Sequence, residues 1–369
     1  MKNNIILLYG GNSVEHEISI LSALSIYKQY IGKYNLILCY LKNSNFYMFK
    51  KLENLNTYKH FNVLNKPIKF IANKNYIINK GKKIYFDAVF LLTHGINCED
   101  GTLFSYFKTL NIPCIAQDIY SASIGQNKAL SKKLCNSKVV PYYYINKNIY
   151  THSLQELLDN ANKLGFPLII KPNKLGSSVG INKVNNIEEL IDNIEYLFNL
   201  DDELLIEKYI NSFYELNIAA IKYKDEIILS EIEKVSNSKL LTYEDKYIVD
   251  QKFLNENNKE LPAIISDKLA SQIKQEAKKI YLSLNAKYIV RMDFLYDLDN
   301  KKLYFNEINN IPGSLATYLF KYVNIDINTL IDMYVDEGLK DIDKNKRIIS
   351  SYEENIFKDV SFNNVKFNK

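Results

Sequence analysis

An apolar strand that ends in two glycines and leads into an amphipathic helix limits this chain to few folds. Ile5–Tyr9 is apolar throughout, Gly10 and Gly11 follow it, and Glu17–Tyr30 carries apolar residues at helical spacing. A buried strand, a tight turn and a covering helix form the repeating unit of open α/β sheets. The N-terminal part is therefore predicted to be such a sheet. Further strands are expected at Leu36–Tyr40 and Ala88–Leu92, and a helix at Leu103–Leu110.

The pattern changes near Tyr214, where strands begin to follow one another directly. Before it, helices and strands alternate at Gln126–Cys135, Ser153–Leu164, Leu168–Lys171, Ile187–Phe198 and Leu204–Ile210. Ser153 with Glu156 three residues later matches a capping box. From Tyr214 on, two hairpins are expected. The first pairs Tyr214–Lys222 with Glu226–Val235, and the second pairs Tyr288–Tyr296 with Leu303–Asn309. Helices are expected at Ser266–Leu284 and Ile327–Leu339. The polar stretch 236–252 predicts a lid loop, and the fold class is mixed α/β and α+β.

Composition excludes several classes of protein. A chain of 369 residues, 47% of them hydrophobic, can form two or three domains with buried cores. Its net charge of +5 gathers in no block, so no nucleic-acid partner is expected. No segment approaches the roughly 20 apolar residues of a membrane span, and Ile5–Tyr9 is shorter than a signal-peptide core. The 4 cysteines show no CxxC pairing, which indicates reduced thiols in a cytoplasmic protein.

A lysine at the end of a predicted strand opens a loop rich in glycine and serine. Lys171 is followed by PNKLGSSVG, up to Gly180. Such a loop can turn successive backbone N–H groups toward phosphate oxygens, while Lys171 adds a point charge. The chain contains neither GxxxxGK[ST] nor a strand followed by GxGxxG. On this loop alone, an ordinary surface turn remains an equally good interpretation.

Polar side chains share one face of the last predicted hairpin. Arg291 and Asp293 are two residues apart on one strand, so they point to the same side. The same holds for Glu307 and Asn309 on the next strand. Asp293 lies opposite Glu307 if the connecting loop has an odd number of residues, for example three around Asn300. Two carboxylates and an amide oxygen suit Mg²⁺ bridging nucleotide phosphates, although a surface ion-pair cluster is the alternative.

Two glycine-flanked segments follow predicted strands and carry polar residues. Residues 10–17 read GGNSVEHE and residues 94–101 read HGINCEDG. Ligands usually bind beyond the carboxyl ends of strands in open α/β sheets, which would place Glu15 near a substrate ammonium group. On this segment alone, the favoured interpretation is that Ser13 or Glu15 caps the helix that follows. A lone histidine such as His94 is more often structural.

Taken in order, these segments resemble the D-alanine–D-alanine ligase family of the ATP-grasp superfamily, from Ile5 to about Leu339. The resemblance implies an ATP-grasp fold preceded by an open α/β domain, with bounds at 1–122, 123–209 and 210–345 and a C-terminal extension at 346–369. It implies ATP-dependent joining of two D-alanines through D-alanyl phosphate, in the cytoplasm, for peptidoglycan precursor synthesis. It also implies a homodimer and two Mg²⁺ ions, for which Mn²⁺ could substitute.

The family pattern assigns the substrate residues. Glu15 corresponds to the glutamate that anchors the amino group of the first D-alanine, and His94 to the histidine near its carboxylate. Ser177 corresponds to the serine that links Glu15 to a lid tyrosine, which here is Tyr247. Lys246, the other member of the KY pair, would face the carboxylate of the second substrate.

The same pattern assigns the nucleotide, metal and oxyanion residues. Arg291 and the N–H of Gly313 would stabilise the oxyanion that forms as the amide bond is made. Asp293, Glu307 and Asn309 would be the metal ligands. The residues implied to contact ATP are Lys128 and Lys171 at the phosphates, Ser178 in the glycine-serine loop, Glu207, Lys208, Tyr209 and Ile210 along the adenine, and Glu215 at the ribose.

Two positions depart from the family pattern. Cys98 stands where glycine is usual, and Tyr318 stands where a serine binds the second substrate's carboxylate. A ligase with D-serine as second substrate therefore stays open, whereas the tyrosine of the KY pair argues against a D-lactate-using relative. Another ATP-grasp carboxylate–amine ligase is opposed by the linked set Glu15, Ser177 and Tyr247. An ATP-binding module without turnover is opposed by the complete set of metal ligands.

Overall fold

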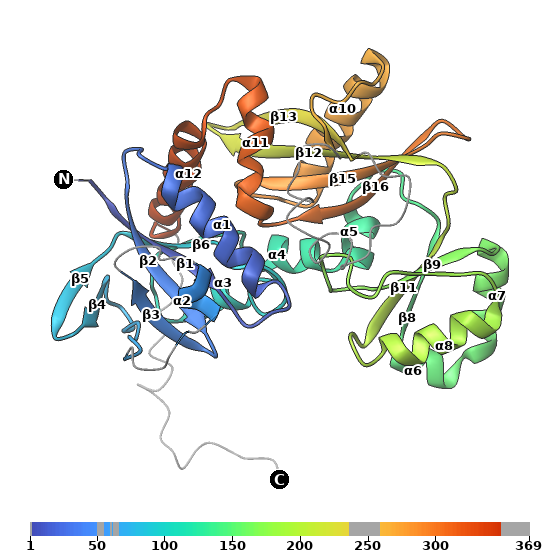
Figure 1. The fold of residues 1–369 in the computed structure, drawn as a ribbon, viewed down its shortest axis with the longest axis horizontal. Coiled ribbons are helices and arrows are strands. Elements are labelled where there is room, and N and C mark those ends of the chain that lie inside the picture. The colour runs from blue at the N-terminus through green and yellow to red at the C-terminus, as the bar shows by residue number, and fades with distance from the viewer. Residues whose placement is uncertain (1, 50–54, 60, 62–65, 236–258, 348–369) are drawn as a thin grey trace, which may run out of the picture.

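The protein, seen in a computed structural model, is built on three sheets of four or five strands and the helices that cover them (Figure 1). Residues 2–49, 55–59, 61, 66–235 and 259–347 are described. The predicted mixture of α/β and α+β layers is confirmed, while the stretch 236–252, predicted as a lid, lies outside the described residues. None of the described helices combines the length and the apolar character that crossing a bilayer requires.

The N-terminal sheet is open and mostly parallel. Its region contains β1 (Asn4–Gly10), α1 (His16–Gln29), β2 (Asn35–Lys42), β3 (Asn45–Phe49), α2 (Leu55–Lys59), β4 (Tyr76–Asn79), β5 (Lys82–Tyr85), β6 (Ala88–Leu91), α3 (Thr102–Thr109) and β7 (Cys114–Ile115). The order is β3-β2-β1-β6-β7, and β1 pairs in parallel with both β2 and β6. α1 covers one face, and α3 with the β4–β5 hairpin covers the other, which explains why β1 is buried along its length.

Two short helices lead from the N-terminal sheet to the next one. They are α4 (Ile119–Gln126) and α5 (Lys128–Leu134). The helix predicted from Gln126 begins two residues later, because Asn127 is extended and its side chain accepts from the Leu130 N–H as an N-cap. α4, which Asp118 caps, was not predicted.

The central sheet is antiparallel, with order β10-β9-β11-β8. Its region contains β8 (Tyr142–Asn146), α6 (Lys147–His152), α7 (Leu154–Leu164), β9 (Leu168–Pro172), β10 (Asn182–Val184), α8 (Ile187–Leu197) and β11 (Glu203–Lys208). α7 and α8 pack on one face. The predicted capping box is wrong: Ser153 makes no side-chain cap bond, and Glu156 instead accepts from the Tyr143 hydroxyl at 3.2 Å. The strand predicted to reach Ile210 ends at Lys208.

The C-terminal sheet is also antiparallel, with order β14-β13-β12-β15-β16. Its region contains β12 (Phe213–Tyr223), β13 (Glu226–Val235), β14 (Lys259–Glu260), α10 (Asp267–Ser283), β15 (Val290–Asp297), β16 (Lys302–Asn309), η3 (Gly313–Ala316), α11 (Thr317–Phe320), η4 (Lys321–Val323) and α12 (Ile327–Asn345). Both predicted hairpins are confirmed. α12 continues past the predicted end at Leu339, because Ile342 still packs against the core.

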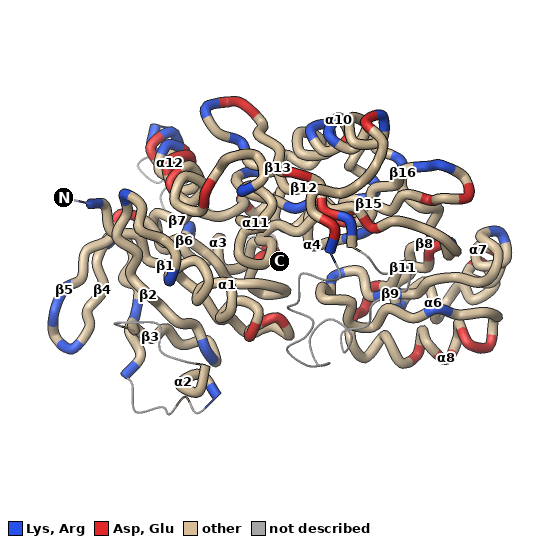
Figure 2. The backbone as a smooth tube through the Cα atoms, turned by 45° about the horizontal axis from the view of Figure 1, so that its top comes forward, with Lys and Arg blue, Asp and Glu red and all other residues tan. Residues whose placement is uncertain are grey.

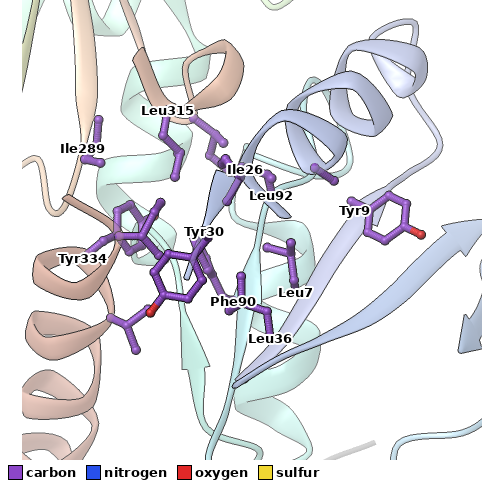
Figure 3. Packing of buried hydrophobic residues seen from close by; sticks show 14 of the residues in the cluster. Leu7, Tyr9, Ile26, Tyr30, Leu36, Phe90, Leu92, Ile289, Leu315 and Tyr334 are labelled. Carbon is purple, nitrogen blue, oxygen red and sulfur yellow. The ribbon is translucent and has the colours of Figure 1, made fainter. Parts of the chain in front are cut away.

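One hydrophobic cluster joins the N-terminal sheet to the C-terminal region (Figure 3). Tyr334 of α12 packs on Phe90 of β6 and stacks on Tyr288, with ring centroids 4.7 and 4.9 Å apart. Leu7 of β1 and Leu315 of η3 belong to the same cluster. Because α12 packs against both β7 and β12, one core joins the N-terminal sheet to the C-terminal sheet.

Candidate active site

A pocket lies between the central and the C-terminal sheets. Val140 and Ile169 contribute apolar surface to its lining, and Glu307 contributes a carboxylate. A slot lined by both apolar and charged side chains suits a flat base joined to phosphates. All the residues predicted to contact ATP line this pocket: Lys128, Lys171, Ser178, Glu207, Lys208, Tyr209, Ile210 and Glu215.

Two lysines share one buried carboxylate at this pocket. Lys171 Nζ lies 2.8 Å from Glu207 Oε2, and Lys132 Nζ lies 3.1 Å from Glu207 Oε1. Burial opposes ionisation of Glu207, but the charges of Lys132 and Lys171 lower its pKa to about 2. Burial lowers the pKa of Lys132, and the charge of Glu207 opposes this shift; with both lysines protonated, two cations and one anion leave a net positive charge here. Lys/Arg and Asp/Glu are interspersed along the described backbone, so this positive charge is local (Figure 2).

Helix α5 places Lys128 against the glycine-serine loop. Lys128 Nζ donates to the Leu175 carbonyl at 2.6 Å and lies 3.5 Å from Glu307 Oε2. In the same loop, Ser177 and Ser178 have φ angles of 55° and 60°, a region that side-chain-bearing residues rarely adopt. Such backbone strain is common where a loop is shaped around a ligand. The contact with Lys128 holds this loop at the edge of the pocket, which Gly176 and Ser178 line.

The last hairpin brings Asp293 opposite Glu307, by a different route from the one predicted. The connecting loop is residues 298–301, an even number, instead of three residues around Asn300. A β-bulge restores the pairing, because Asp293 pairs with Glu307 while Phe294 pairs with Phe305, which leaves Asn306 as the extra residue. Asn306 lines the pocket, where its Oδ1 accepts from Lys171 Nζ at 3.3 Å.

Arg291 and Asn309 both bind Asp293. Arg291 Nε and Nη2 donate to the two oxygens of Asp293 at 2.7 and 2.8 Å. Asn309 Nδ2 donates to Asp293 Oδ2 at 3.0 Å. Burial disfavours the charge of Arg291, but the adjacent Asp293 raises the pKa of its guanidinium overall, so the guanidinium stays charged. The predicted polar face thus exists and is tightly ordered.

This donor set fits a hard cation. Oδ1 of Asp293 keeps a lone pair after accepting one bond from Arg291, and Asn309 keeps its amide oxygen. Carboxylate and amide oxygens are the ligands that Mg²⁺ and Mn²⁺ prefer. Within the described ranges no three His, Cys, Asp or Glu side chains gather as a metal site, so the cation would need the oxygen of Asn309 beside Asp293 and Glu307.

Glu15 lies where the N-terminal sheet meets the glycine-serine loop. Ser177 Oγ donates a short hydrogen bond to Glu15 Oε1. Gly95 and Gly176 leave room for the carboxylate, because a Cβ on either would lie 2.8 Å from a Glu15 oxygen. The alternative that the side chain caps α1 is excluded, since it makes no cap hydrogen bond. Burial raises the pKa of Glu15, while the Ser177 hydrogen bond and the charge of Lys128 oppose this.

His94 is a buried, neutral histidine. Burial lowers its pKa to about 4. Its carbonyl accepts from Ser13 Oγ at 2.6 Å, and its Nε2 lies 3.5 Å from Ser22 Oγ. Ser22 in turn accepts from the Ser314 N–H at 2.9 Å. His94 is thus connected through Ser22 to the turn that begins at Gly313.

Comparison with known proteins identifies the family. The chain matches the family described as D-ala D-ala ligase N-terminus over residues 4–117, and the one described as D-ala D-ala ligase C-terminus over residues 133–335. A D-alanine–D-alanine ligase from Thermosipho africanus is 36% identical over 374 residues, which cover 96% of this chain and 98% of that protein.

The chain belongs to the D-alanine–D-alanine ligase family. A D-alanine–D-alanine ligase from Campylobacter jejuni is 32% identical and covers 92% of this chain and 95% of its own length. Among solved structures, the VanG D-Ala:D-Ser ligase from Enterococcus faecalis has a TM-score of 0.77 at 26% identity, covering 92% of this chain and 100% of that one. The D-alanine–D-alanine ligase from Helicobacter pylori has a TM-score of 0.70 at 28% identity, covering 90% and 98%.

Tyr318, which departs from the D-alanine–D-alanine ligase pattern, sits in a charged cluster. Its hydroxyl donates to Glu233 Oε2 at 2.9 Å. Lys259 Nζ lies 3.0 Å from Glu233 Oε1 and 4.9 Å from the centre of the Tyr318 ring. Burial raises the pKa of Tyr318, so its hydroxyl remains a neutral donor. The expected serine is thus replaced by a longer donor held by a carboxylate and a lysine.

Gly313 begins a turn with an uncommon backbone. Ser314, Leu315 and Ala316 have φ angles of 48°, 53° and 49°. Three such angles in succession are uncommon for non-glycine residues, and here Leu315 and Ala316 are fully buried. The turn packs against α1, where Ser22 Oγ accepts from the Ser314 N–H.

Two residues assigned from the ligase pattern, Lys246 and Tyr247, are not among the described residues.

Cys98 fits the turn in which the family usually has glycine. The Cys98 thiol packs against Gly11, where an added Cβ would lie 2.5 Å from its sulfur. Cys98 N–H still donates to the Gly95 carbonyl at 3.1 Å, so the turn forms without the usual glycine. All four cysteines are buried and free, as predicted.

Three residues of the site were not predicted: Lys132, Glu233 and Asn306. Lys132 follows Lys128 by one helical turn, and that spacing on a helix could have indicated a second lysine on the same side. Glu233 is a single acidic residue within a strand and gives no such signal. Asn306 reaches the pocket only because of the bulge.

Proposed function

We propose that the chain joins two D-alanines into D-alanyl-D-alanine, with conversion of ATP to ADP, through a D-alanyl phosphate. The product would supply peptidoglycan precursor synthesis. The observation that carries this proposal is the hydrogen bond from Ser177 to Glu15. It joins a carboxylate suited to an amino acid's ammonium group to the loop that lines the nucleotide pocket. An amino acid held there has its own carboxylate close to the terminal phosphate of ATP.

The nucleotide would lie in the pocket between the two sheets. The stretch from Glu207 to Ile210 would contact the adenine, and Glu215 the ribose. Lys171, Lys128 and Ser178 would bind the phosphates. Asp293, Glu307 and Asn309 would hold two Mg²⁺ ions, or Mn²⁺ in their place, which when bound neutralise charge on the transferring phosphoryl group.

The residues of the chain would act in sequence. Glu15 holds the first D-alanine, whose carboxylate oxygen attacks the γ-phosphorus while the bond to the bridging oxygen of ADP breaks. Lys171 and Lys128 offset the charge of the transferring group. The amine of the second D-alanine then attacks the acyl carbonyl, loses a proton and expels inorganic phosphate. Arg291 and the Gly313 N–H stabilise the oxyanion of this step.

A product assay tests the proposal and its alternative. D-serine as second substrate is favoured by Tyr318 in the second-substrate region and by the likeness to VanG. ADP release is measured with D-alanine alone and with D-alanine plus D-serine, and the dipeptide is identified by mass. We expect D-alanyl-D-alanine as the main product of both mixtures. Mixed D-alanyl-D-serine as the main product would favour the alternative, and ATP turnover without either dipeptide would contradict both.

We further propose the domain bounds 1–122, 123–209 and 210–345, and a homodimer that acts in the cytoplasm. The bounds are supported by the three sheets, each of which lies within one range. Light scattering of the purified protein would measure the oligomeric state, and a mass of 43.0 kDa would indicate a monomer.

Activity should depend on pH through Glu15. Its raised pKa means that the protonated form, which cannot pair with an ammonium group, persists above the ordinary value of 4.5. We expect kcat/KM for the first D-alanine to rise with pH through a midpoint above 4.5. Glu15→Gln should lower kcat/KM and remove this acid limb. An unchanged limb in Glu15→Gln would assign the titration to another group.

Removing the Tyr318 hydroxyl should act on one substrate only. Tyr318→Phe keeps the ring beneath Lys259 but removes the donor to Glu233. In the complex the hydroxyl would turn from Glu233 to the carboxylate of the second D-alanine. Losing that hydrogen bond to a charged group should raise KM for the second D-alanine about tenfold, with little change in KM for ATP. Initial rates at varied D-alanine separate the two amino-acid constants. Equal loss of affinity for both D-alanines would contradict a second-substrate role.

A further inference from the structure

Helix α5 carries a second lysine that the proposed mechanism does not use. Lys132 lies one turn after Lys128, and its side chain is 0% exposed. Its Nζ lies 3.1 Å from Glu207 Oε1. Lys132 itself does not line the pocket, whereas Glu207 and Lys171 do. The cation therefore approaches Glu207 from behind, on the side away from the nucleotide.

Stability alone does not explain a lysine at this place. A buried ammonium group loses its hydration, and a well-packed apolar residue is often as stable or more so. The pairing here is also incomplete, because neither Lys132 Nζ nor Glu207 Oε1 has a hydrogen-bond partner among the described residues. The two atoms attract through charge rather than through an aligned hydrogen bond. The site therefore keeps a charge that packing does not require.

The position of Glu207 indicates what the charge of Lys132 does. Glu207 Oε2 accepts from Lys171 Nζ at 2.8 Å, so a carboxylate with no other cation would form a neutral pair with Lys171. A neutral pair attracts phosphate weakly. Lys132 supplies a second positive charge to the same carboxylate, and the three groups together keep a net positive charge. Lys171 can then act as a cation toward an incoming anion.

We propose that Lys132 is a positioning residue for nucleotide binding: it neutralises Glu207 from behind and so leaves the charge of Lys171 to the nucleotide phosphates. This rests on the nucleotide site proposed above. The same helix carries Lys128, which touches the Leu175 carbonyl and lies close to Glu307. One helix therefore sets the charge at both sheets that border the pocket.

The test is a cycle of MgADP affinities measured by calorimetry on the full chain. Lys132→Met is expected to weaken MgADP binding about tenfold, the scale of one charge-assisted contact. In the Glu207→Gln background, Lys132→Met is expected to change the affinity less than about twofold, because no carboxylate remains to be neutralised. The matched control is Lys287→Met, which removes a lysine paired with Asp118 at 3.1 Å, outside the pocket lining, and should bind as the wild type does.

Steady-state kinetics provide a second readout that a merely structural role would not move. Lys132→Met should raise KM for ATP and leave KM for D-alanine close to that of the wild type. If Lys132→Met does not fold, Lys132→Gln, which removes the charge but keeps a polar side chain, takes its place in both arms of the cycle with the same expected results.

Three results would overturn the inference. One is a Lys132→Met variant that binds MgADP like the wild type. Another is an equal loss caused by Lys132→Met with and without Glu207→Gln, which would mean that Lys132 does not act through that carboxylate. Failure of the wild type itself to bind MgADP would overturn the nucleotide site and the role of Lys132 with it.

Discussion

Arg291→Ala is expected to slow turnover at least about 100-fold at saturating substrate, the typical effect of removing one donor to a developing oxyanion. The guanidinium is held in one orientation by two bonds to Asp293, of 2.7 and 2.8 Å. It is therefore preorganised for charge that appears only in the transition state, and its loss should lower kcat more than it raises either KM.

Stability must be measured beside activity in this variant. Alanine leaves the Asp293 carboxylate without its forked partner, and breaking a buried pair costs about 3 kcal/mol or more. Asn309 still donates to Asp293 at 3.0 Å and should offset part of that loss. Melting temperature and circular dichroism give the folded fraction to which kcat is referred. Arg291→Lys is the control that keeps the charge without the fork, and near-normal kcat in folded Arg291→Ala would refute the role.

Glu307→Gln is expected to lower turnover by about 100-fold and to raise the Mg²⁺ concentration needed for half-maximal activity. Glu307 lines the pocket and pairs across the hairpin with Asp293, the other carboxylate proposed as a metal ligand, and an amide is a weaker ligand than a carboxylate. The measurement is kcat as a function of Mg²⁺.

The Mg²⁺ titration separates ligand loss from the other contact of Glu307. Glu307 also lies 3.5 Å from Lys128 Nζ, and losing that ion pair would not be relieved by added metal. Tyr304→Phe, on the same strand but outside the pocket lining, is the matched control and should titrate like the wild type. A Glu307→Gln variant with reduced kcat but an unchanged Mg²⁺ midpoint would contradict the ligand role.

Much of the site follows from patterns that act over a few residues. Alternation along β15 and β16 places Arg291 with Asp293, and Glu307 with Asn309, on a single face. Gly176 and Gly95 make space for a carboxylate, and they are visible in the sequence as glycines after strands. These features depend on local geometry, so the chain order alone could predict them, and the order of four such segments identified the family.

Other features depend on contacts between distant parts of the chain. The register that sets Asp293 opposite Glu307 comes from a bulge at Asn306. With the four-residue loop 298–301 and no bulge, Asp293 would not pair with Glu307. The shared core of α12 with the N-terminal sheet joins regions that periodicity treats as separate. Neither signal is present in any short window of sequence.

Sequence by itself determined most of the elements, the polar faces and the family, because side-chain period and turn residues act locally. Only the tertiary structure showed that Glu207 lies between Lys132 and Lys171. Only the tertiary structure showed that Tyr318 donates to Glu233, which also pairs with Lys259. Two charged side chains interact strongly when they are buried side by side. Which side chains become buried together depends on how the whole chain packs.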